Sequence, residues 1–152
     1  MYKAGSVYYG KFKLSEIETK NKYLIVFHLF EDTCLLTTFT TSQPRSGVDN
    51  PVHGHNPATK PYRSYVFKKG IAIGDIPITN IPFSFQEDTA IVPDYGFAKK
   101  SISDLHFSVQ NLTMVCQLYP NEFIDLIYTL YHSKGTPNWV KDVLEVKLDE
   151  LL

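Results

Sequence analysis

The chain has 152 residues, of which 43% are hydrophobic and 20% are charged, a balance typical of globular proteins and unlike that of disordered ones. This length predicts one domain over residues 1–152 that buries a core without needing disulfides or a structural metal. The net charge of −1 gives no overall basic signal for nucleic acid, and no apolar run is long enough for a transmembrane helix, so no membrane contact is expected.

The amino-terminal end and the cysteines give further expectations. The amino-terminal residues MYKAGSVYYG lack the apolar core of a signal peptide, which predicts a cytoplasmic protein. Cys34 and Cys116 both lie in apolar, strand-like surroundings, as reduced core cysteines do. Neither belongs to a CxxC or paired His–Cys pattern, so we expect no zinc site and no other cofactor.

Strand patterns come first along the chain. A first strand is expected over 5–12, and a polar link over 15–22 leads to a second strand over 23–30. The run 23–27 is continuously apolar, which predicts a strand buried on both faces. Glu31 and Asp32 then form a turn into a threonine-rich strand over 33–41, so that the two strands make an antiparallel hairpin.

The segment 42–63 carries many prolines and glycines, which exclude regular structure there. Loops of this length are usually functional or disordered. With the few residues that follow it, the segment is also basic, whereas the carboxyl end is acidic. Short strands are expected over 64–68, 71–78 and 89–93, then one helical turn over 101–105 and an alternating stretch over 106–118.

The pattern becomes helical at the carboxyl end. Apolar residues over 123–131 recur with helical spacing, between Pro120 at a first-turn position and Gly135 at the stop. A second apolar stripe, over 140–151, follows Pro137. The predicted architecture is therefore a small, curved β-barrel over about 1–118, followed by one or two helices over about 120–151.

Two groups in the 42–63 segment are candidate binding residues. His53 and His55 flank a glycine and can serve as acid and base, as a metal pair, or as ordinary loop residues. Arg45 and Arg63 bracket the segment, with Tyr62 beside the second arginine. Arginine with neighbouring aromatics suits single-stranded nucleic acid, although arginine also ties loops to backbone carbonyls.

Several short stretches resemble the MazF/PemK family of toxin endoribonucleases. Residues 5–8 resemble the family's opening strand, 22–26 its second strand and 35–42 its third strand. Residues 85–92 resemble its later Asp-Ser strand, 99–105 the turn that follows, and 118–123 the start of its terminal helix. The resemblance implies an SH3-like barrel of the MazF/PemK/CcdB type followed by a helix. Three features depart from the family: Ser6 and Lys22 stand where an acid and an arginine are usual, and a later arginine is missing.

The resemblance also implies an activity. The family cleaves single-stranded RNA without metal, through attack of the 2′-hydroxyl on the adjacent phosphate. It commonly uses an arginine before the second strand, where this chain has Lys22, and a hydroxyl after the third strand, which is Thr40 or Thr41 here. Arg45 and His53 would then join them around the scissile phosphate, with His55, Tyr62 and Arg63 as further RNA-binding residues. A homodimer and an acidic, apolar antitoxin segment in the same groove are the implied partners.

A second hypothesis is a non-catalytic SH3-like module that binds a peptide or protein in a groove lined by Tyr62, Tyr65 and neighbouring aromatics. The two hypotheses differ in geometry. Catalysis requires that Lys22, the end of the threonine-rich strand and the 42–63 segment converge on one pocket.

Overall fold

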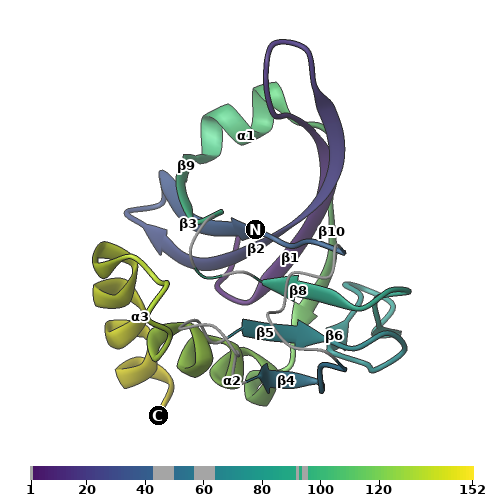
Figure 1. Ribbon diagram of the computed structural model, residues 1–152. Coiled ribbons are helices and arrows are strands. Elements are labelled where there is room, and N and C mark those ends of the chain that lie inside the picture. Colours follow the sequence, from purple (N-terminus) through teal and green to yellow (C-terminus); the bar gives the residue numbers. More distant parts are fainter. Residues whose placement is uncertain (1, 43–49, 57–63, 92, 94–95) are drawn as a thin grey trace.

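The protein is mainly β, with helices at its carboxyl end, as predicted (Figure 1). The computed structural model describes residues 2–42, 50–56, 64–91, 93 and 96–152. The strands are β1 Ser6–Lys13, β2 Thr19–Phe30, β3 Cys34–Phe39, β4 Gly54–Asn56, β5 Ser64–Phe67, β6 Gly74–Asp75, β7 Pro82–Phe83, β8 Thr89–Ile91, β9 Ala98–Ser101 and β10 Gln110–Leu118. The helices are α1 Ile102–Ser108, α2 Pro120–Tyr131 and α3 Asn138–Leu151.

Two antiparallel sheets make up the β part. The larger has the strand order β7-β6-β10-β1-β2-β3-β9, and the smaller has the order β4-β5-β8. Thr41, just beyond β3, exchanges two backbone hydrogen bonds of 3.0 and 2.8 Å with Ala90 of β8 and so joins the two sheets. Among the described residues the larger sheet begins and ends at different strands, so the closed barrel expected from the sequence is not seen.

Strand β2 runs through the middle of the core. Residues 24–27 are at most 1% exposed, which confirms a strand buried on both faces. Ile25 and Phe27 belong to the apolar cluster that includes α2 and α3, whereas Leu24 and Val26 belong to a second cluster with Leu105 of α1. Because side chains alternate along a strand, β2 contributes to both clusters at once.

The carboxyl-terminal helices match their predicted pattern. Helix α2 buries Phe123, Leu126, Ile127 and Leu130, and α3 buries three residues of its apolar stripe. Figure 1 shows both helices on the side of the molecule where β4 and β5 lie, and α1 at the opposite end. The predicted helical turn over 101–105 is a seven-residue helix whose first turn is capped by the Ser101 hydroxyl. No helix in the described part of the chain is long and apolar enough to span a bilayer.

Three local predictions were wrong. The 42–63 segment contains β4, because Gly54 and Asn56 pair with Val66 and Ser64 of β5 although the local sequence is rich in turn formers. The polar link before the second strand is shorter than predicted, since β2 begins at Thr19. The strand expected over 71–78 is reduced to β6, because the chain turns between Ile76 and Ile81.

Candidate functional site

A cleft of about 1010 Å³ opens where β2 begins and β3 ends. Its lining includes residues 20–23 of β2, residues 39–42, and residues 83–87 from the end of β7 and the segment before β8. The lining combines hydroxyl, amide, ammonium, carboxylate and aromatic groups. It includes Lys22, Thr40 and Thr41, so the structure brings the three predicted catalytic residues to one cleft.

The strand register decides which threonine accompanies Lys22. Leu24 pairs with Phe39, and the Thr40 amide donates to the Tyr23 carbonyl oxygen at 3.2 Å. Continuing this register sets Lys22 opposite Thr41, and directly opposite residues project from the same face of a sheet. Thr40 projects from the other face with Tyr23, and only 5% of its surface is exposed. Thr41 is therefore the threonine that shares a face with the lysine.

Backbone pairing holds both residues in place. Lys22 pairs with Gly10 of β1, inside the long β1–β2 ladder. Thr41 is held by its two backbone bonds to Ala90. The Lys22 side chain is partly buried and makes no ion pair within the described residues. A cation fixed by its strand and without a protein anion is suited to an anionic ligand.

Aromatic side chains line much of the cleft. Tyr9 and Tyr23 face each other across β1 and β2 with ring centroids 4.5 Å apart. Phe85 packs edge-on against Tyr23 at 4.8 Å, and Phe83 packs against Phe85 at 5.3 Å. Burial, followed by the neighbouring Tyr9, raises the pKa of Tyr23, so its phenol is protonated at neutral pH. Because Tyr23 and Lys22 are adjacent on β2, these four rings lie on the face opposite to the lysine, and Phe39, which pairs with Leu24, is the ring on the lysine's own face.

The cleft also holds carboxylates that the sequence did not identify. Glu18 and Glu87 line it together with Lys20 and Lys22, so its charged groups balance. Nothing local in the sequence relates residues 18 and 87 to position 22. A balanced cleft of this kind can accept a proton as well as stabilise an anion.

The predicted histidines lie elsewhere. His53 is fixed at both ring nitrogens: Nδ1 accepts from the Lys68 amide at 3.0 Å, and Nε2 donates to the Glu122 carboxylate at 2.9 Å. Neither His53 nor the exposed His55, which pairs with Tyr65 on β5, is among the cleft residues. The structure therefore does not bring His53 to Lys22.

The other predicted binding residues divide in two. Arg45, Tyr62 and Arg63 lie outside the described residues. Tyr65 is 1% exposed, and its hydroxyl donates to Glu122 of α2. Burial and the adjacent Glu122 carboxylate raise the pKa of Tyr65. Tyr65 is thus a core residue, so the prediction that it lines a peptide groove was wrong.

The described residues contain no group of three or more His, Cys, Asp or Glu side chains arranged to hold a metal ion. No known protein family, curated protein or solved structure matches the chain.

Proposed function

We propose that the protein is an endoribonuclease that cleaves single-stranded RNA in the cleft at Lys22, without metal, as MazF/PemK-like toxins do. The observation that carries this proposal is the convergence of Lys22 and Thr41, from adjacent strands, on one aromatic-rich cleft. Lys22 offers a phosphate contact and Phe39, on the same face, offers a stacking surface, and these are the two kinds of contact typical of single-stranded nucleic acid sites. By the same resemblance, the protein is a cytoplasmic homodimer with an SH3-like barrel, and an antitoxin segment occupies the groove.

The proposed reaction is an internal transfer of the phosphate. The ribose 2′-oxygen attacks the adjacent phosphorus, the bond to the 5′-oxygen breaks, and the products are a 2′,3′-cyclic phosphate and a free 5′-hydroxyl. A cleft carboxylate, from Glu18 or Glu87, accepts the 2′-hydroxyl proton, and water supplies the proton that the leaving oxygen takes. The Lys22 ammonium and the Thr41 hydroxyl stabilise the charge that builds up on the non-bridging phosphate oxygens.

The test is incubation of the purified protein with a long single-stranded RNA in the presence of chelator. We expect discrete cleavage, reduced about 10²–10³-fold by Lys22→Ala, because removing one preorganised charge-stabilising group has an effect of that size. Thr41→Ala should reduce cleavage more than Thr40→Ala, because Thr41 shares the face of Lys22. Lys134→Ala, an exposed lysine in the turn after α2, is the matched control and should cleave like the wild type.

The carboxylates provide a second check. Either Glu18→Gln or Glu87→Gln should lower the cleavage rate and flatten its pH profile, since each removes a proton acceptor but preserves side-chain shape. RNA left intact by the wild-type protein would refute the enzyme proposal. The cleft would then fit the second hypothesis, a binding module, with its peptide site at Tyr9, Tyr23 and Phe83.

A further inference from the structure

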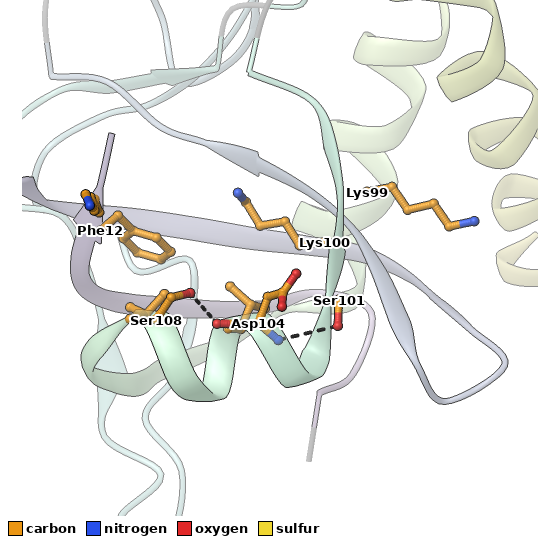
Figure 2. A pocket seen from close by; sticks show the side chains of 9 residues that line it. Phe12, Lys99, Lys100, Ser101, Asp104 and Ser108 are labelled. Carbon is orange, nitrogen blue, oxygen red and sulfur yellow. Dashed lines mark hydrogen bonds between the residues drawn. The ribbon is translucent and has the colours of Figure 1, made fainter. Parts of the chain in front are cut away.

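A second, smaller pocket of about 280 Å³ lies between the end of β1, strand β9 and helix α1 (Figure 2). Its walls include Phe12, Lys13, Lys99, Lys100, Asp104 and Ser108. Figure 2 shows the side chains of Lys99 and Lys100 leaving β9 in opposite directions, with Lys100 on the side of Phe12. The two ammonium groups accordingly lie over different rings: Lys99 over Phe30 and Lys100 over Phe39.

Lys100 is a half-buried cation that makes no ion pair with any described residue. Its Nζ lies 5.2 Å from the centroid of the Phe39 ring. No carboxylate of the described residues lies within ion-pair distance of it, although Asp104 lines the same pocket. Burial lowers the pKa of Lys100, which means that desolvation destabilises its charged form. An anion in the pocket would compensate that cost.

The pocket and the cleft share a wall. Phe39 lines the cleft, and its ring packs edge-on against Phe12 of the pocket at 4.9 Å. Phe12 also pairs with Lys20 in the β1–β2 ladder, and Lys20 lines the cleft. Cationic and aromatic groups therefore continue without interruption from Lys22 past Phe39 to Lys100.

We propose that the Lys100 pocket binds a second phosphate of the RNA strand whose scissile phosphate lies at Lys22, with Phe39 as the contact for the base between them. This inference rests on the proposed function, because it extends the same binding track. The alternation of cation, aromatic ring and cation matches the phosphate, base and phosphate of an extended strand. Lys13 is a weaker candidate for this contact, since it pairs with Glu16 at 3.5 Å on the exposed β1–β2 hairpin.

The experiment measures binding separately from cleavage. A labelled, fully 2′-O-methylated RNA lacks the 2′-hydroxyl nucleophile, so its affinity for the protein can be measured by fluorescence anisotropy over a range of salt concentrations. We expect Lys100→Gln to weaken binding roughly five- to tenfold. We also expect it to reduce the slope of log K against log salt by about 0.7, the value for one lost phosphate contact with a single strand.

Lys99→Gln is the matched control and removes the same charge. Lys99 also lines the pocket, but its side chain leaves β9 in the direction opposite to Lys100, and its ammonium lies over Phe30. The control variant should leave both the affinity and the salt slope unchanged. Melting temperatures of the two variants check that both are folded, and Lys100→Met, which preserves the apolar stem, replaces Lys100→Gln if that variant is unstable.

Two sets of results separate this inference from the proposed function. Wild-type affinity and salt slope in Lys100→Gln, with RNA cleavage intact, would overturn the second phosphate site alone. Lys100-dependent binding of the methylated RNA, without cleavage of ordinary RNA, would support the site and refute the enzyme. A protein that binds no RNA but binds polyglutamate through Lys100 would overturn both in favour of an acidic peptide.

Discussion

Glu122 joins helix α2 to the smaller sheet, and its replacement should destabilise the fold. Its carboxylate accepts hydrogen bonds from His53 Nε2 and from the Tyr65 hydroxyl. The side chains of His53 and Glu122 are only 23% and 11% exposed. Hydrogen bonds to a charged group contribute about 1.5–3 kcal/mol each, whereas a neutral one contributes about 1 kcal/mol. Glu122→Gln should therefore lower the free energy of unfolding by about 2 kcal/mol, because an amide can replace only one of the two bonds.

Glu122→Ala should cost more, about 3–4 kcal/mol, because it leaves two largely buried donors without an acceptor. Tyr65→Phe should cost about 1.5–3 kcal/mol, since it removes one hydrogen bond to the charged carboxylate and leaves the carboxylate bound to His53. Equilibrium unfolding in urea measures these differences for each variant. A double-mutant cycle of Tyr65→Phe with Glu122→Gln should give a coupling energy of about 1 kcal/mol.

The matched control is Glu16→Gln, a change of the same chemistry at a side chain that is 95% exposed. It should alter the free energy of unfolding by less than about 0.5 kcal/mol. If Glu122→Ala is no more destabilising than this control, the carboxylate does not hold α2 to β4 and β5, and the reasoning fails.

The same contact predicts a pH dependence. The pKa of Tyr65 in the folded protein is raised, first by burial and then by its bond to Glu122. Its contribution to stability is therefore complete below the ordinary tyrosine value of about 10 and is lost as the pH rises above it. Tyr65→Phe should lose less stability than the wild type between pH 9 and 11, and equal losses would contradict the assignment.

Three further experiments test other parts of the fold. Cys34 should react with a thiol reagent at pH 8 in the native protein, whereas Cys116 should react only after unfolding, since burial raises its pKa to about 12. Gly74→Ala should lower the free energy of unfolding in urea by at least about 2 kcal/mol, because a Cβ there would overlap the backbone of β10. Gly70 has open space around it, so Gly70→Ala should lower this free energy by about 1 kcal/mol from its positive φ alone. Ile78 is 98% exposed and lies at φ +72 in a strained γ-turn. Ile78→Gly should therefore raise the free energy of unfolding by about 0.5 kcal/mol, because glycine adopts a positive φ without strain. A loss of stability would show that the Ile78 side chain packs against the protein.

The parts of the fold that the sequence predicted well are those in which burial leaves a local pattern. The apolar run in β2 and the helical spacing in α2 and α3 depend only on which faces are buried. Strand β4 has no such pattern. Gly54 lies at φ +93, and the Asn56 side chain bonds to the backbone at Val52 and Gly54, so only pairing with β5 makes this turn-like stretch a strand.

The candidate site shows the same division. Lys22 and the pair Thr40 and Thr41 could be named from the sequence, because strand ends are recognisable by composition and by resemblance. Glu18 and Glu87 could not be named, since they reach the cleft from a hairpin and a turn far apart in the chain. His53 was a candidate because of the local pattern around Gly54, but its two ring nitrogens bond to Glu122 of α2 and to the Lys68 amide just after β5.

The choice of Thr41 over Thr40 depends on an irregularity inside β2. Near the Glu31–Asp32 turn, Phe30 pairs with Cys34 and His28 with Leu36, a register that would set Tyr23 opposite Thr41. The register shifts by one residue between Val26 and His28, so that Val26 pairs with Thr37 and Lys22 comes level with Thr41 instead. A one-residue shift moves a side chain to the opposite face, and bulges beside functional sites commonly re-aim side chains in this way. The extra residue, Phe27, is fully buried, so packing in the core determines which hydroxyl lies beside the lysine.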